Sequence, residues 1–82
     1  MYRVIMHDDD YTTMDFVVEV LMKIFHKSSL EASNIMLQVH NDGKGVAGVY
    51  TYDIAATKKL QANQMAGQMG FPLKLTLDED LS

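Results

Sequence analysis

The sequence predicts an α/β fold, a two-layer sandwich in which three helices cover a small, mainly antiparallel three-stranded sheet. Three observations lead to this prediction. Runs of β-prone residues lie near both ends of the chain and in its middle, and stretches with apolar residues at helical spacing separate them. Capping residues or glycines mark most of the boundaries. The expected order of elements is therefore β-α-α-β-α-β.

The first strand is expected from Tyr2 to Met6, and it leads into the three consecutive carboxylates of Asp8, Asp9 and Asp10. Adjacent solvated carboxylates repel one another by roughly 1 kcal/mol per pair. A fold gains nothing from placing them together unless a cation or backbone N–H groups take up the charge. This acidic turn is the candidate functional site, and the plain alternative is a solvated turn that only caps a helix.

A helix from Met14 to Phe25 follows, and Thr12 and Asp15 have the spacing of a capping box at its start. Only a narrow stripe of this helix is polar, so it is apolar on more than one side. One apolar face is enough for a helix that packs on a single sheet. The apolar side chains on its other sides should therefore contact another helix or line a cavity.

The second helix is expected from about Ser29 to Asn41, because Ser28 and Glu31 form another capping-box pattern. Gly43 follows the helix closely and suits the left-handed conformation that ends many helices. Met36 and His40 lie four residues apart and so share one face of this helix.

The second half of the chain contains the remaining three elements. Gly43 to Tyr52 reads as a glycine-punctuated loop that leads into a strand, and Asp53 suits the cap of a helix from about Ile54 to Met69. The alternating residues from Leu73 to Leu77 are typical of a half-buried strand. Residues 78–82 form an acidic tail that is expected to fray.

Length and composition limit the classes of function. We expect the 82 residues to form one domain, residues 1–82. The net charge of −4 and the scattered seven Lys and Arg argue against nucleic acid or an anionic membrane as the main partner, and favour a cationic or amine-bearing ligand. The sequence has no cysteine, which is compatible with the cytosol, and no apolar run long enough to span a membrane.

The acidic turn can bind a protonated α-amino group. Such a group donates three hydrogen bonds, so it needs two or three acceptors without a competing donor. Asp8 and Asp10 can supply two of them, and a neutral His40 near the end of the second helix can supply a third. Apolar residues of the first two helices could then form the walls of an adjoining pocket: Met14, Val17, Met36 and Val39.

The run from Asp8 to Val17 resembles the Asn-Asp-Asp-Tyr-Thr-Pro-Met-Glu-Phe-Val signature of the ClpS family, bacterial adaptors of the Clp protease that recognise destabilising N-terminal residues. The likeness continues in order over nearly the whole chain. It includes Phe25-His26-Lys27, Ile35-Met36-Leu37-Gln38-Val39-His40, Gly48-Val49-Tyr50-Thr51-Tyr52, Thr57-Lys58 and Pro72-Leu73. Three residues depart from the signature, since Asp8 replaces its Asn, Thr13 replaces its Pro and Asp15 replaces its Glu.

The resemblance implies a fold similar to the C-terminal domain of a ribosomal stalk protein. It also implies a monomeric, non-enzymatic adaptor without a cofactor or metal, which binds proteins with N-terminal Leu, Phe, Tyr or Trp. The adaptor would deliver these N-degron proteins to an ATP-dependent Clp unfoldase of the AAA+ class in the bacterial cytosol. The chain begins almost at the first strand, so we expect it to lack the N-terminal extension that the family uses in delivery.

The resemblance also implies which residues form each site. The residues that match the family's α-amine site are Asp8, Asp10 and His40. Those that match the side-chain pocket are Thr12, Met14, Val17, Met36, Val39 and Leu73. Those that match the unfoldase-docking positions are Asp53 and Lys58.

Two other classes of function stay open at this point. His7, the three carboxylates and His40 offer ligands for a divalent metal, although the contiguous acids lack the alternation of an EF-hand loop. A generic protein-interaction domain of the ribosomal-stalk type, without an amine pocket, is the second alternative. An enzyme is disfavoured, because the sequence has no cysteine, no Gly-rich phosphate loop and no G-x-S-x-G motif.

Overall fold

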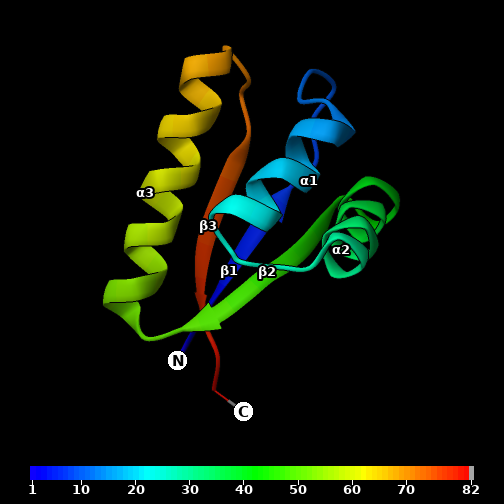
Figure 1. Ribbon diagram of the computed structural model, residues 1–82. Coiled ribbons are helices and arrows are strands. Elements are labelled where there is room, and N and C mark those ends of the chain that lie inside the picture. The colour runs from blue at the N-terminus through cyan, green and yellow to red at the C-terminus, as the bar shows by residue number, and fades with distance from the viewer. Residues whose placement is uncertain (82) are drawn as a thin grey trace.

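The computed structural model describes residues 1–81, and within them the predicted order of three strands and three helices is found (Figure 1). The elements are β1 (Tyr2–His7), α1 (Met14–Lys23), α2 (Ser29–Asp42), β2 (Lys44–Tyr50), α3 (Tyr52–Met69) and β3 (Lys74–Glu79).

The three strands form a sheet in the order β2-β1-β3, and β1 pairs antiparallel with both neighbours. His7 at the end of β1 lies opposite Lys44 on one side and Lys74 on the other. The register with β2 shifts between Val4 and Ile5, which marks a β-bulge. Because β1 is central, the turn that follows it lies at the middle of one end of the sheet.

The helices pack on one face of this sheet, with α3 alongside β3, α2 beside β2 and α1 between them (Figure 1). Val4 and Met6 point from β1 into the core and are fully buried. The rings of Phe16 and Phe71 lie 4.9 Å apart and join α1 to the segment before β3. The small side chains of α3 at Ala55, Ala62 and Ala66 are buried, as their spacing predicts for a helix that lies close to the sheet.

The start of α1 differs from the expected capping box. Thr13, not Thr12, is the N-cap, and its Oγ1 accepts a hydrogen bond from the backbone N–H of Phe16. Thr12 instead bonds to Asp9 in the preceding turn. The two threonines are equally good caps, so the hydrogen bonds of the turn decide which one caps the helix.

The ends of α2 agree with the sequence. Ser28 and Glu31 make both hydrogen bonds of a capping box, each at 3.1 Å. Gly43 has a φ of 85°, and its N–H bonds to the carbonyl of Val39. A residue with a Cβ is strained in this left-handed conformation, which accounts for a glycine at the end of the helix.

Three boundaries in the second half differ from expectation. β2 begins at Lys44 without an intervening loop, and α3 begins at Tyr52 after the cap residue Thr51, so Asp53 lies inside the helix and does not cap it. β3 extends to Glu79, because Asp78 and Glu79 still pair with Arg3 and Tyr2 of β1, and a 2.9 Å ion pair joins the side chains of Arg3 and Asp78. The predicted frayed tail is therefore partly strand, and its last position, residue 82, lies outside the described residues.

Candidate functional site

A cavity of about 400 Å³ lies where the turn after β1, the start of α1 and the second half of α2 meet. Its lining combines the acidic turn with apolar side chains from two helices: Asp8, Asp9, Asp10, Tyr11, Thr12, Thr13, Met14, Val17, Met36, Val39 and His40. The structure thus brings together eight of the nine residues that the sequence assigned to amine binding and the side-chain pocket. The exception is Leu73.

Asp9 organises the acidic turn. Its Oδ1 accepts hydrogen bonds from the N–H of Tyr11 at 2.8 Å and of Thr12 at 2.6 Å, and its Oδ2 accepts one from Oγ1 of Thr12 at 2.7 Å. Burial alone would raise the pKa of Asp9, but the hydrogen bonds from Thr12 and Tyr11 outweigh it and lower the pKa. Both carboxylate oxygens of Asp9 therefore accept hydrogen bonds from within the turn, and these bonds stabilise the conformation of its backbone.

The carboxylates on either side of Asp9 are exposed to solvent at the cavity. The backbone N–H of Asp8 bonds to the carbonyl of Gly43 at 2.9 Å, which fastens the end of β1 to the junction between α2 and β2. His40 lies in the last turn of α2, three residues before Gly43. The bond brings the end of α2 next to the turn, and His40 lines the same cavity as Asp8.

The apolar side of the cavity has a fixed part and an adjustable part. Val17 and Val39 are 6% and 2% exposed and belong to the core. Met14 is 44% exposed, and Met36 is partly buried against the core. Methionine has three rotatable side-chain bonds and fits irregular shapes, so the outer wall can adjust to ligands of different size.

Leu73 is 6% exposed and packs in the core just before β3, and it does not line this cavity. Sequence matching could not show this, since core and pocket residues of a small domain are both apolar. The turn also contributes Asp9, Tyr11 and Thr13 to the lining, none of which was assigned to amine binding or to the side-chain pocket from the sequence. The residue type of Asp9 was the available signal, because an Asp in a turn commonly accepts a hydrogen bond from the backbone N–H two residues further on, here that of Tyr11.

The two remaining predicted residues lie elsewhere. Asp53 and Lys58 line a separate cavity of about 330 Å³ at the start of α3, together with His26 and Ile54. Lys58 is not a free solvated charge. Its Nζ donates to the backbone carbonyl of Ile24 at 2.8 Å and lies 5.4 Å from the centre of the Tyr50 ring.

The metal alternative finds no support in the geometry. Among residues 1–81, no three His, Asp or Glu side chains lie close enough to hold a metal ion together. In the same part of the chain, no helix is both long and apolar enough to cross a membrane.

Comparison with known proteins decides the family. The family model described as ATP-dependent Clp protease adaptor protein ClpS matches residues 1–76. The chain belongs to the ClpS family. It is 61% identical over 79 residues to the ClpS of Syntrophus aciditrophicus, covering 96% of this chain and 74% of that protein. It is 54% identical over 80 residues to the ClpS of Acetivibrio thermocellus, covering 98% of this chain and 81% of that one.

A solved ClpS structure is also similar. Agrobacterium tumefaciens ClpS2 bound to L-phenylalaninamide superposes with a TM-score of 0.92 at 35% identity, covering 96% of this chain and 95% of that one. The likeness confirms the predicted fold class. Members of the ClpS family are adaptors of the Clp protease and are not themselves enzymes, so the prediction of a non-enzymatic adaptor is confirmed.

Proposed function

We propose that this ClpS protein binds N-degron proteins that begin with Leu, Phe, Tyr or Trp and delivers them to a Clp unfoldase. One observation carries the proposal: a single cavity has exposed carboxylates at one side and apolar side chains at the other. An N-terminal residue of this kind presents the same pair of features, an ammonium and a large apolar side chain. The phenylalaninamide bound by the ClpS2 relative also combines a free amine with a phenyl ring.

In this proposal the ammonium binds to Asp8, Asp10 and His40, which all line the cavity. Asp9 has less to offer the amine, because Tyr11 and Thr12 already donate three hydrogen bonds to its two oxygens. Charge-assisted hydrogen bonds are the strong ones, and the exposed carboxylates have acceptor sites to offer.

The first side chain enters between Met14 and Val17 on α1 and Met36 and Val39 on α2. Burial of a Phe or Leu side chain contributes about 1.5–3 kcal/mol. Serine and glutamate gain no such contribution, and glutamate also brings a charge next to the acidic turn. The wall formed by Met14 and Met36 would allow one cavity to accept both branched and aromatic residues.

Calorimetric titration with short peptides tests both halves of the site. A peptide with N-terminal Phe should bind at least ten times tighter than the same peptide with N-terminal Ser or Glu. Acetylation of the Phe peptide should weaken binding by about 1–3 kcal/mol, because it removes the charge and leaves acceptors without a donor. Equal binding of the Phe and Ser peptides would refute the proposed specificity. Titration with Ca²⁺, Mg²⁺ or Zn²⁺ in the same session tests the metal alternative.

We place the unfoldase-docking surface at the start of α3, around Asp53 and Lys58. Three features support this placement. Both residues match the docking positions of the family, both line one cavity, and none of the residues of that cavity lines the proposed N-degron site. The adaptor could therefore hold a substrate and contact the unfoldase at the same time.

A further inference from the structure

The face of the sheet opposite the helices carries an unusual set of side chains. Val4 and Met6 of β1 point into the core, so the residues that alternate with them point to the other side. The pairing register extends this assignment to β2 and β3. We name this surface the open sheet face, and it consists of Arg3, Ile5, His7, Lys44, Val46, Val49, Lys74, Thr76 and Asp78.

Three residues of the open sheet face are apolar. Ile5 lies directly opposite Val46, and Val46 and Val49 are 37% and 40% exposed. The solvated face of an antiparallel sheet is commonly polar, in alternation with the buried face. Exposed apolar residues on the edge strand β2 are a hazard for aggregation unless something covers them or their surroundings keep other chains away.

The open sheet face is positively charged on an acidic protein. This face has three cationic residues, Arg3, Lys44 and Lys74, and one anionic residue, Asp78, so its formal charge is +2. The whole chain carries −4, so the residues outside this face carry −6. The cations thus surround the apolar residues at one place and are not spread evenly over the surface.

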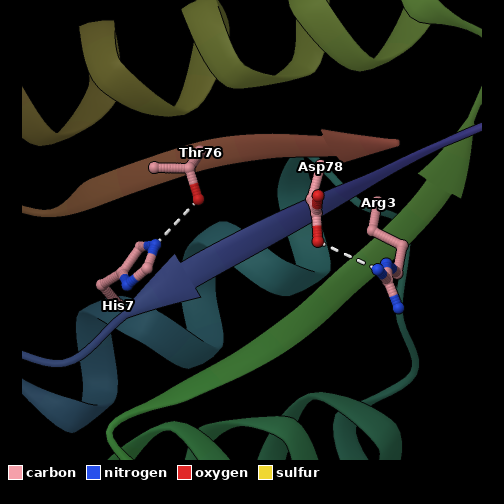
Figure 2. A network of polar contacts seen from close by, with 4 residues as sticks. All are labelled: Arg3, His7, Thr76 and Asp78. Atoms are coloured by element: carbon pink, nitrogen blue, oxygen red, sulfur yellow. Dashed lines mark hydrogen bonds and ion pairs between the residues drawn. The ribbon is translucent and has the colours of Figure 1, made fainter. Parts of the chain in front are cut away.

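The pKa of His7 reports the same positive field. His7 lies between Lys44 and Lys74 in one row across the three strands. Its pKa is lowered from its ordinary value, first by burial and then by repulsion from these two lysines. Its Nε2 is 2.8 Å from Oγ1 of Thr76 on the same face (Figure 2). His7 is therefore neutral near pH 7 and leaves the lysines available for an anion.

A groove of about 240 Å³ crosses this face, and Arg3, Lys44 and Val46 contribute to its lining. Arg3 is joined to Asp78 on the neighbouring strand through Nη2, and both side chains stay partly exposed (Figure 2). Its Nε is buried, and no acceptor for it lies among the described residues. The guanidinium thus has a donor that its present ion pair does not satisfy.

We propose that the open sheet face docks an acidic segment of a partner protein. Carboxylates of the segment meet Arg3, Lys44 and Lys74, and an apolar side chain between them covers Ile5, Val46 and Val49. The charge of the face specifies an anionic partner. The apolar centre and the absence of an aromatic side chain from its nine residues favour a polypeptide over a single-stranded nucleic acid, whose bases would stack on aromatic rings.

This surface differs from the two sites proposed above. No residue of the open sheet face lines the N-degron cavity or the cavity at the start of α3. His7 is the one residue of the face that is next to the acidic turn in the sequence, since it precedes Asp8. The adaptor would then carry a third contact that is independent of its substrate.

The probe for the test is an acetylated peptide of alternating Glu and Val residues, because acetylation keeps it out of the amine site. We expect amide NMR shifts at Ile5, Val46 and Val49, and a rise in the pKa of His7 when the peptide's carboxylates approach. The double variant Lys44→Gln/Lys74→Gln should bind the peptide at least fivefold more weakly. The matched double variant Lys23→Gln/Lys59→Gln removes the same charge from α1 and α3 and should bind within twofold of the parent.

Several outcomes would overturn the proposal. Absence of binding at millimolar peptide would do so, as would equal weakening in the two double variants, which would indicate a general charge effect. Equal binding of a control peptide with Gln in place of Glu would remove the role of charge. Tighter binding of a single-stranded oligonucleotide through Lys44 and Lys74 would assign the face to nucleic acid. None of these outcomes affects binding of a Phe-initiated peptide, so the two proposals fail separately.

Discussion

The ammonium of Lys58 caps the end of another helix. Its Nζ lies 2.8 Å from the backbone oxygen of Ile24, the C-cap residue of α1, and 5.4 Å from the centre of the Tyr50 ring. The last carbonyls of a helix have no partner within the helix, and a cation there also interacts favourably with the helix dipole. Lys58 therefore joins α1, α3 and β2, in addition to its proposed contact with the unfoldase.

Replacement of Lys58 by Met should destabilise the fold. The variant loses a charged hydrogen bond and a cation-π contact but keeps most of the apolar stem, so we expect a loss of about 1–2 kcal/mol in the free energy of unfolding. Urea denaturation measures it. Lys59→Met removes the same charge from the next position of α3 and should cost less than about 0.5 kcal/mol. Equal costs would show that the bond to Ile24 contributes nothing specific.

The same contact changes how the docking surface should be tested. Charge reversal at Lys58 would put a carboxylate beside the carbonyl of Ile24 and disturb the fold. Asp53→Lys is the cleaner variant, because the Asp53 side chain is exposed on the first turn of α3. We expect it to weaken binding to the unfoldase and to leave the affinity for a Phe-initiated peptide within about twofold, since exposed charges contribute only ~0.2–1 kcal/mol. Loss of peptide binding in this variant would contradict separate sites.

Asp9→Ala should damage both the turn and peptide binding. It removes the acceptor of three hydrogen bonds, at an expected cost of about 1–3 kcal/mol in stability. Asp9→Asn is the matched control. Its amide oxygen can still accept from the two N–H groups, and its NH₂ can donate to the Thr12 hydroxyl, which reverses its role. If Asp9 only shapes the turn, the Asn variant should bind a Phe-initiated peptide nearly as well as the parent, and a large loss would place Asp9 in contact with the amine.

Asp9 also gives a pH dependence. Its pKa is lower in the folded chain than its ordinary value. A group of this kind contributes stability that is complete above the pKa of the unfolded chain and is lost as the pH falls through the folded pKa. Stability should therefore decrease below about pH 4, and the decrease should be smaller in Asp9→Asn. Identical acid profiles for the two proteins would contradict the role of the ionised carboxylate.

His7 should titrate below its ordinary pKa, and NMR of its imidazole can measure this. Because its pKa is lower in the folded chain, His7 takes up a proton at a higher pH in the unfolded chain than in the folded chain. The contribution of His7 to stability is therefore complete above the unfolded pKa of about 6.5 and is lost as the pH falls through the folded pKa. Lys44→Gln/Lys74→Gln should move the pKa of His7 upward, because it removes two of the three causes of the shift. An unchanged pKa would leave burial as its cause.

The sequence was sufficient for the order of elements because most boundaries carry a local signal. The capping box of Ser28 and Glu31 and the left-handed Gly43 depend only on nearby residues, and both are present. The choice between Thr12 and Thr13 as the cap of α1 was beyond such reasoning. It depends on Asp9, whose hydrogen bonds engage Thr12 and leave Thr13 to cap the helix.

Contacts between distant elements explain the other differences. Lys58 bonds to Ile24, which is 34 positions away, and Arg3 bonds to Asp78, which is 75 positions away. No local sequence pattern can predict contacts over such distances along the chain. Pairing with Arg3 and Tyr2 of β1 includes in β3 two residues, Asp78 and Glu79, that were predicted to belong to a frayed acidic tail. Leu73 shows the same limit for the site, because an apolar residue before a strand can face the core or a cavity, and its sequence pattern is the same in both cases.

Asp8 is the residue of the turn whose replacement tests the amine site most directly. Its carboxylate is exposed at the cavity, and its backbone N–H is fixed to Gly43. Asp8→Asn restores the residue of the family signature without changing the side chain's shape, and removes one charge from three adjacent carboxylates. The affinity for a Phe-initiated peptide should then depend less steeply on salt, because screening acts on fewer charge pairs. The preference for bulky apolar first residues should persist, since Met14, Val17, Met36 and Val39 are unchanged.

Calorimetry at low and high salt measures both effects. If neither the affinity nor its salt dependence changed, Asp8 would not contact the amine, and Asp10 and His40 would have to bind it alone.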